Sequence, residues 1–216
     1  MIPYINIHTH HLSQDNGVFL FNNRFGFDKK YFLEKYFSVG IHPWDGDVQV
    51  SLIEFEQIIQ HQNCLAIGEC GLDKLKGPDL EIQKTIFIRQ LDLAVKYQLP
   101  VIIHCVRAFD ELMEVCKPYY SKVPLIIHGF NKSSELAKQL IDKGFYISFH
   151  HSVFDKRDDY FSSIVIEKIF LETDHNANVS IIEVYKKASS SFQLSENDLK
   201  EKIYTNFTAL FKNYGR

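Results

Sequence analysis

The chain lacks any excess of basic charge: 24 Lys and Arg stand against 27 Asp and Glu, for a net charge of -3. A nucleic-acid partner would therefore need a local basic patch, or metal ions, to offset its phosphates. No stretch approaches the roughly 20 apolar residues of a membrane span. The opening "MIPYINIHTHH" also lacks the basic and apolar regions of a secretory signal. We expect no membrane partner and a cytoplasmic protein.

Cysteine and glycine patterns exclude two further classes. The four cysteines form no CxxC pair and are too few to frame a chain of this length with disulfides, so we expect reduced thiols. No glycine-rich phosphate loop follows any apolar run, which removes the main signature of the open nucleotide-binding sheets. At 216 residues the chain can form one sizeable core, and we expect a single domain over residues 1–216.

Short apolar runs alternate with longer amphipathic segments along the chain. The runs predict strands over residues 2–8, 37–41, 65–69, 100–104, 125–128, 145–149 and 169–174. Apolar residues at three- and four-residue spacing predict helices over residues 50–61, 80–98, 108–118, 133–143, 162–168, 180–189 and 195–212. Continuously apolar strands that alternate with helices indicate a parallel sheet covered by helices, either a closed barrel or an open sheet.

Several predicted strands are followed by a polar residue, and this residue always stands at the C-terminal end of the apolar run. The residues in question are His8 and His10, then His42, Glu69, His104, His128 and Asp174. In a (β/α) barrel these ends converge on one mouth, where active sites are built. His8 and His10 are two residues apart and face the same side of a strand, whereas His11 falls on the other face. The pattern favours a TIM-like (β/α) barrel with helices outside.

Imidazoles and carboxylates in this number suit one or two divalent ions of the first transition row. A carboxylate can bridge two metals, as in two-metal hydrolytic sites, where the ions lower the pKa of a shared water. A single histidine such as His42 is as readily an ordinary surface group. The ordered set, one polar residue after another at the same end of the sheet, is what favours a metal site.

The motifs "INIHTH", "VGIHPW", "AIGECGLD", "VIIHCV", "LIIHGF", "YISF" and "FLETD" stand in this order up to residue 174. In them the chain resembles the TatD-related metal-dependent deoxyribonucleases, a family of amidohydrolase-type barrels. The resemblance implies a distorted barrel with two metals, whether zinc, manganese, magnesium or iron, and DNA as the substrate. It also implies that His8, His10 and Asp174 bind one ion, that His104 and His128 bind the other, and that Glu69 bridges them.

The resemblance further implies roles in the reaction. Asp174 would accept a proton from the attacking water, so that Asp174 and Glu69 are the expected catalytic residues. His42 would contact the substrate or support a ligand, and Arg107 would hold a phosphate. An exposed arginine in the first turn of a helix is an equally good reading of Arg107.

The chain departs from the family pattern in several places. Asn6 stands where the family has an aspartate, and we expect it to support the ligands by hydrogen bonding. The segment between His10 and Gly40 is short: "GVFLFNN" is expected to form a small strand at most, leaving seven strands or an open barrel. After "ETD" the chain reads "HNANVS", which places His175 and Asn176 at the expected substrate surface. His150 and His151 are expected to form a solvated strand end rather than part of the pocket.

Three functions fit these residues. The first is a phosphodiesterase, foremost a deoxyribonuclease acting on single strands or ends, with aromatic residues for base stacking. Trp44, Phe109, Phe130 and Phe149 are the candidates for stacking, and core packing is the alternative for each. The second is a hydrolase of a small amide, ester or lactone, which the acidic net charge favours. The third is a metal-binding protein without turnover, against which the intact Glu69 and Asp174 argue. No obligate protein partner is evident.

Overall fold

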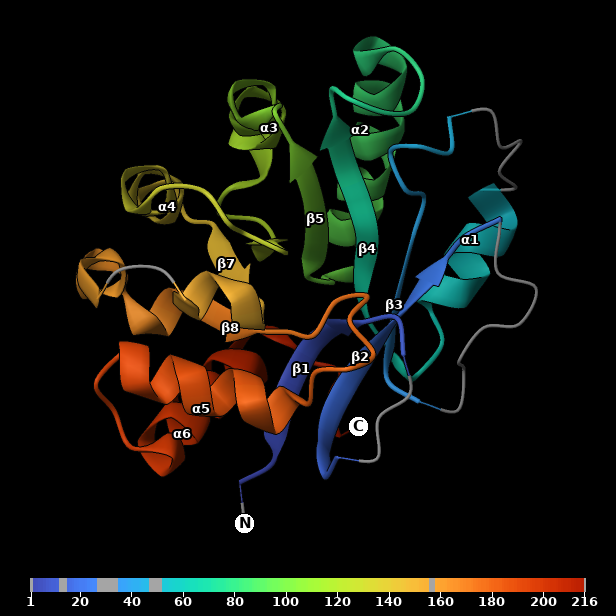
Figure 1. The fold of residues 1–216 in the computed structure, drawn as a ribbon. Helices are drawn as coiled ribbons and strands as arrows, with labels where there is room; N and C mark the ends of the chain where they lie inside the picture. The colour runs from blue at the N-terminus through green and yellow to red at the C-terminus, as the bar shows by residue number, and fades with distance from the viewer. Residues whose placement is uncertain (1, 12–14, 27–34, 47–51, 156–157, 216) are drawn as a thin grey trace.

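A single sheet of eight parallel strands forms the centre of the molecule (Figure 1). The computed structural model describes residues 2–11, 15–26, 35–46, 52–155 and 158–215. The strands follow one another around the sheet in chain order: β1 (Tyr4–Thr9), β2 (Gly17–Arg24), β3 (Phe37–Gly40), β4 (Cys64–Asp73), β5 (Val101–Val106), β6 (Leu125–Ile127), β7 (Tyr146–Phe149) and β8 (Ile169–Leu171). The expected parallel sheet is confirmed.

The sheet curls into a nearly closed barrel, because its first and last strands meet at one end. A parallel bridge pairs Thr9 with Asp174, and the amide of Asp174 donates to the carbonyl of His8 at 3.1 Å. Asn6 adds two side-chain bonds across the same seam: its Nδ2 donates to Thr173 Oγ1 at 2.8 Å, and its Oδ1 accepts from Thr173 N at 3.2 Å. These contacts stand in for a ladder between β1 and β8.

The expectation of seven strands or an open barrel is wrong, because β2 is a full strand. It runs for eight residues, is parallel to both β1 and β3, and is buried along nearly its whole length. Parallel neighbours normally need a crossover of about a dozen residues or more. Only residues 10–16 join β1 to β2. A chain of seven residues can span at most roughly 23 Å, which is enough to return along a six-residue strand of roughly 20 Å.

Helices surround the barrel: α1 (Leu52–Ile59), α2 (Leu80–Tyr97), α3 (Phe109–Cys116), α4 (Ser134–Asp142), α5 (Ile181–Ser191) and α6 (Glu196–Leu210). Each was expected, although residues 50 and 51 of the first lie outside the described residues. The helix expected over residues 162–168 is wrong. The chain there forms 3-10 turns, η3 (Asp158–Ser163) and η4 (Ile166–Lys168), because three β-branched residues from Ile164 to Ile166 disfavour an α-helix. Two more 3-10 turns are η1 (Lys117–Tyr119) and η2 (His151–Asp155).

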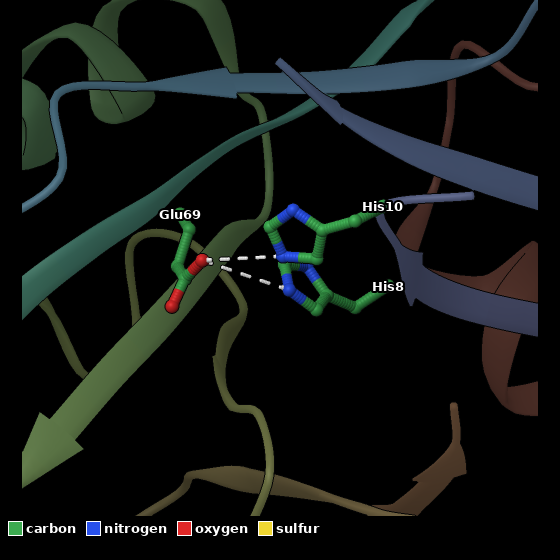
Figure 2. A group of neighbouring side chains, drawn as sticks. All are labelled: His8, His10 and Glu69. Atoms are coloured by element: carbon green, nitrogen blue, oxygen red, sulfur yellow. Dashed lines mark ion pairs between the residues drawn. The ribbon is translucent and has the colours of Figure 1, made fainter. Parts of the chain in front are cut away.

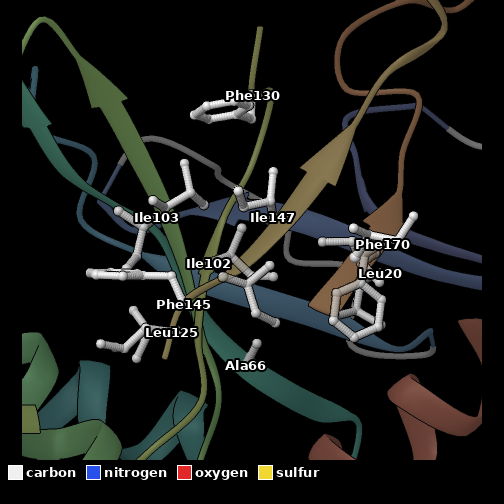
Figure 3. Close-up of a cluster of buried hydrophobic side chains, with 14 of the residues drawn as sticks. Leu20, Ala66, Ile102, Ile103, Leu125, Phe130, Phe145, Ile147 and Phe170 are labelled. Carbon is white, nitrogen blue, oxygen red and sulfur yellow. The ribbon is translucent and has the colours of Figure 1, made fainter. Parts of the chain in front are cut away.

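The core lies inside the barrel and between the strands and their helices. Ile102 and Ile103, neighbours on β5, point to opposite faces and are both fully buried (Figure 3). This two-sided burial explains why the strands read as continuous apolar runs. Each such side chain contributes about 1.5–3 kcal/mol by leaving water. The densely packed barrel therefore provides a frame for the polar residues at its mouth.

No helix in the described part of the chain is long and apolar enough to cross a membrane.

Candidate active site

The carboxylate of Glu69, on β4, lies at the centre of the barrel mouth. It is 6% exposed and is surrounded by five imidazoles from four other strands or their ends. The ring nitrogens nearest to it belong to His8 at 3.7 Å, His10 at 3.8 Å, His42 at 3.3 Å, His104 at 2.7 Å and His128 at 2.8 Å. The structure thus brings together the residues that the strand ends predicted.

The two oxygens of Glu69 face different groups of histidines. Oε2 faces Nε2 of both His8 and His10 (Figure 2). Asp174 closes this first cluster, with Oδ1 at 3.5 Å from His8 Nε2 and 3.6 Å from His10 Nε2. Oε1 faces the second cluster, whose members are His42, His104 and His128. One carboxylate is therefore shared by two sets of ligand-type side chains.

Two glycines of "GECGLD" allow Glu69 to take this position. Between Ile67 and Cys70 the register of β4 against β5 shifts by one residue, so that β4 bulges where Glu69 lies. Gly68 and Gly71 have φ of +142° and +143°. A Cβ at Gly68 would lie 2.4 Å from the carbonyl oxygen of Ile102, and one at Gly71 would lie 2.1 Å from that of His104. Only glycine fits at these two positions, one in the bulge and one just after it, where the backbone of β4 packs this closely against β5.

The charges in the mouth are those of a cation site. Although burial raises the pKa of Glu69, the charge of His128 and hydrogen bonds with His104 and His128 lower it well below its ordinary value. Burial likewise raises the pKa of Asp174, but contact with His8 and the charge of His128 outweigh it and leave the group ionised. Two carboxylates therefore keep their negative charge in a largely buried cluster, where a cation is stabilised.

The histidines divide into two kinds. Burial and the neighbouring His8 lower the pKa of His10 to about 4, and burial lowers that of His42. Both rings are thus neutral near pH 7, the form that binds metals. Burial also lowers the pKa of His128, but the negative charge of Glu69 and a hydrogen bond with Glu172 raise it well above its ordinary value. Without a metal, a proton on His128 offsets part of the negative charge.

His8 supplies the test of whether a metal fits. The residue is fully buried, and neither Nδ1 nor Nε2 has a hydrogen-bond partner among the described residues. A buried imidazole left in this state is costly unless one nitrogen ligates a cation. Potential ligand atoms also converge within 4.8 Å in three groups: His8, His10 and Glu69; His8, His128 and Asp174; and His42, Glu69 and His104. The residues therefore fit divalent metal binding.

Comparison with known proteins assigns the chain to a family. The family model described as TatD related DNase matches residues 21–212. The chain belongs to this family. It is 30% identical over 146 residues to the "3'-5' ssDNA/RNA exonuclease TatD" of Klebsiella pneumoniae, a match covering 63% of this chain and 56% of that protein. It is also 30% identical over 148 residues to Escherichia coli "Uncharacterized metal-dependent hydrolase YjjV", covering 64% and 57%. The matched region thus spans a little over half the length of these relatives.

Solved structures of TatD relatives share the barrel over its full extent. The crystal structure of YjjV, the TatD homologue from Escherichia coli, superposes with a TM-score of 0.80 at 22% identity, covering 98% of this chain and 99% of that one. A TatD family hydrolase from Entamoeba histolytica superposes with a TM-score of 0.77 at 16% identity, covering 97% and 98%. The expected family and the barrel fold are both confirmed.

Three polar residues that support the TatD site were missed from the sequence. Asn22 of β2 accepts from the amide of Glu69 at 3.0 Å and donates to its Oε2 at 3.3 Å. Asp73 lies 3.3 Å from Nε2 of His104, and Glu172 lies 3.4 Å from Nδ1 of His128. The signal for Asp73 and Glu172 was present, since each lies inside a quoted motif and a carboxylate is a common hydrogen-bond partner for the second ring nitrogen of a metal-binding histidine. Asn22 was missed because its segment was expected to form a small strand at most, whereas it lies in the full strand β2.

Three further residues that the sequence analysis singled out are His42, Arg107 and Asn6. Of the two roles expected for His42, the structure favours support of the ligands over contact with substrate, because the residue is only 6% exposed and its Nε2 lies 3.3 Å from Glu69 Oε1. Arg107 is exposed just before α3, with a left-handed φ of +54°. Asn6 bonds to Thr173 across the barrel seam, whereas it was expected to support the ligands.

Four further histidines follow strand ends near the mouth. His175 is exposed, with Nδ1 3.0 Å from Asp174 Oδ2, and its carbonyl contacts the ring of His11 at 2.8 Å. Asn176 and His11 both line a neighbouring pocket of about 300 Å³. His150 and His151 are half-buried at the start of η2, where His150 pairs with Ser152 at 3.0 Å. Among these residues only His175 contacts a member of the two clusters.

Proposed function

We propose that the protein is a metal-dependent nuclease, foremost a deoxyribonuclease that hydrolyses phosphodiester bonds in single strands. The observation that carries the proposal is Glu69, which directs one carboxylate oxygen to each of two imidazole clusters. A shared carboxylate is the arrangement of two-metal sites that cleave phosphodiesters. The name of the Klebsiella relative, a 3'-5' exonuclease of single-stranded DNA and RNA, supports this substrate class.

The ligands divide between two proposed divalent ions. His8, His10 and Asp174 would hold one ion, His104 and His128 the other, and Glu69 would contact both, with His42 adding a nitrogen on the second side. Imidazole-rich sets suit zinc or iron better than magnesium, which prefers oxygen ligands. When bound, such ions lower the pKa of water and stabilise negative charge on phosphate oxygens.

The side chains of the mouth prepare the reaction. Asp174 is ionised and partly open to solvent, so its carboxylate accepts the proton that the attacking water loses. His175, 3.0 Å from Asp174 Oδ2 on the exposed side, can then take that proton toward solvent. Arg107, exposed one residue past the end of β5, would hold a flanking phosphate of the substrate.

A hydrolase of a small amide, ester or lactone is the second candidate. The same site would serve it, and a chain with a net charge of -3 gives a long polyanion no general attraction. Hydrolysis of these substrates would need the same ions and the same proton acceptor. The two candidates therefore differ in substrate and not in the residues that act.

One assay separates these functions. Protein reconstituted with zinc or manganese is incubated with labelled single-stranded DNA, double-stranded DNA and RNA, and in parallel with nitrophenyl esters and anilides. We expect metal-dependent cleavage of single strands, lost in Glu69→Gln. Turnover of the esters or anilides alone would establish the second candidate. Stoichiometric metal without any turnover would instead indicate a binding protein.

We also propose a cytoplasmic location. All four cysteines are free, and Cys64, Cys70 and Cys116 are buried. Free thiols are typical of proteins in a reducing compartment.

A further inference from the structure

Trp44 occupies an unusual place for a large apolar side chain. It is the only tryptophan in the chain, and it remains 38% exposed in the loop after β3, beside the metal-ligand cluster. The edge of its ring meets His42, with ring centroids 4.4 Å apart, and His104, with centroids 5.8 Å apart. An indole left open to solvent next to a reaction site is a candidate contact for a ligand.

The indole is held rigidly. Its Nε1 donates to Oδ2 of Asp73 at 2.7 Å, and its backbone amide lies 3.3 Å from Nδ1 of His42. The loop after β3 also interlocks with the loop after β4. A Cβ at Gly46 would lie 2.2 Å from Cγ of Pro78, and one at Gly77 would lie 2.5 Å from the carbonyl oxygen of Pro43. A surface fixed in this way loses little entropy when a ligand covers it.

Positive charge lies beside the same ring. The ammonium of Lys76 is 4.4 Å from the ring centroid, and the guanidinium carbon of Arg24 is 5.9 Å from it. Arg24 is paired with Asp45, its Nε donating to Oδ2 at 2.5 Å, whereas Lys76 is exposed on the loop after β4. An aromatic face with an adjacent cation is the combination with which proteins hold single-stranded nucleic acid, by stacking a base and contacting its phosphate.

The other expected stacking residues do not offer such a face. Phe130 is 2% exposed and Phe149 is fully buried, so both belong to the core. Phe109 is half-buried and packs against Phe130, with ring centroids 6.1 Å apart. Of the four aromatic residues considered from the sequence, only Trp44 can contact a base without unpacking the core.

We propose that Trp44 is the stacking surface for a nucleobase adjacent to the phosphate that is cleaved, and that Lys76 contacts the backbone of the same nucleotide. The proposal rests on the proposed nuclease function and adds that this protein recognises an unpaired base. Lys76 moves off the indole when the base stacks, because its exposed side chain is free to follow a phosphate. The site thereby favours single strands, whose bases are available, over duplexes.

The first test compares two substrates of the metal-reconstituted protein: a single-stranded oligonucleotide, and the same strand with abasic residues at its 3' end. We expect kcat/KM to favour the normal strand about tenfold, near the lower end of the range for one base stacked on an aromatic ring. Trp44→Ala should remove this preference chiefly through KM, and Trp44→Phe should keep part of it. Val165→Ala, which trims an exposed apolar side chain before β8, is the control and should keep all of it.

Trp44 also donates a hydrogen bond to Asp73, which contacts His104. A loss of activity caused by a displaced His104 must therefore be distinguished from a loss of base stacking. If Trp44 acts only by positioning Asp73 and His104, Trp44→Ala will slow both strands equally, which would overturn the proposal. A wild-type protein that cleaves normal and abasic strands equally well would overturn it too.

The second test needs no turnover. Since Trp44 is the only tryptophan, its fluorescence reports on this site alone. Thymidine 5'-monophosphate should quench it in the metal-reconstituted protein, and deoxyribose 5-phosphate should not. If no oligonucleotide is cleaved, the nuclease function fails and this titration alone decides the stacking surface. Equal responses to the two ligands, or no response to either, would refute it.

Discussion

Glu172 lies against the ring of His128, with Oε1 of the carboxylate 3.4 Å from Nδ1 of the imidazole. The same oxygen accepts a hydrogen bond from the amide of Gly129 at 2.8 Å, which fixes the carboxylate. On its other side His128 directs Nε2 to Glu69 at 2.8 Å. The His128 ring thus lies between two carboxylates. The contact of Nδ1 with Glu172 fixes the orientation of the ring, so that Nε2 points into the mouth.

This relationship predicts that Glu172→Gln weakens metal binding. The amide keeps an acceptor for Gly129 but loses the negative charge beside His128, and losses of such partners reduce metal affinity by roughly 10–100-fold. Isothermal titration of the metal-free protein should show the weaker site, and activity should recover at high metal concentration. Glu167→Gln, at an exposed glutamate of η4, is the matched control. Unchanged affinity in Glu172→Gln would contradict the role of this carboxylate.

Glu69→Gln should abolish hydrolysis while the fold is retained. The substitution removes the charge shared by both imidazole clusters, so one or both ions are lost and activity falls by at least roughly 10²–10³-fold, as when a principal charge-stabilising group is removed. Metal content per chain and initial rates measure the two effects, and circular dichroism checks the fold. Glu81→Gln, at an exposed glutamate of α2, should be indistinguishable from wild type. Full activity in Glu69→Gln would end the two-metal proposal.

The ligand set could be predicted because its members end strands that are visible as apolar runs. His104 and His128 each follow a run of isoleucines, and the fold alone brings such ends together. Asn22 could not be predicted, because residues 17–23 were expected to form a small strand at most and gave no sign of a full parallel strand. The burial of His42 could not be predicted either, since it depends on two loops that interlock at Gly46 and Gly77. Packing between distant loops leaves no periodic signal in a sequence.

Gly71→Ala should be strongly destabilising. A methyl group there would lie 2.1 Å from the carbonyl oxygen of His104, and the backbone has a φ of +143°. Strain of this kind costs about 1–3 kcal/mol before the clash is counted. Gly144→Ala is the control, because Gly144 has a φ of +103° but its nearest atom would be 3.7 Å away. Urea unfolding should show a larger loss of stability for Gly71→Ala than for Gly144→Ala; equal losses would mean that β4 and β5 move apart enough to admit the methyl group.

Asn6→Asp should lower the stability of the metal-free protein by about 1–3 kcal/mol, the range for a buried hydrogen-bonding group left unsatisfied. Asn6 is 1% exposed, and its Nδ2 donates to Thr173 Oγ1 across the seam of the barrel. A carboxylate cannot donate and brings a charge into a buried position. Asn178→Asp makes the same chemical change at an exposed residue and should be neutral. Urea unfolding measures the free energy of unfolding of both variants and the wild type. Equal stability of Asn6→Asp and wild type would show that the seam between β1 and β8 does not depend on this hydrogen bond.

Removal of metal should lower the melting temperature. Glu69 and Asp174 stay ionised in the native mouth, so a divalent ion binds the folded chain far better than the unfolded one. At a free concentration 100 times Kd, one ion adds about 2.7 kcal/mol to stability. For a chain of this size that corresponds to roughly 5–10 °C. Calorimetry with zinc, with manganese and after chelation measures the shift. It should shrink in Glu69→Gln, because the shared ligand is gone. If the melting temperature is the same with and without metal at these concentrations, the histidines and Glu69 form a hydrogen-bonded network and not a metal site.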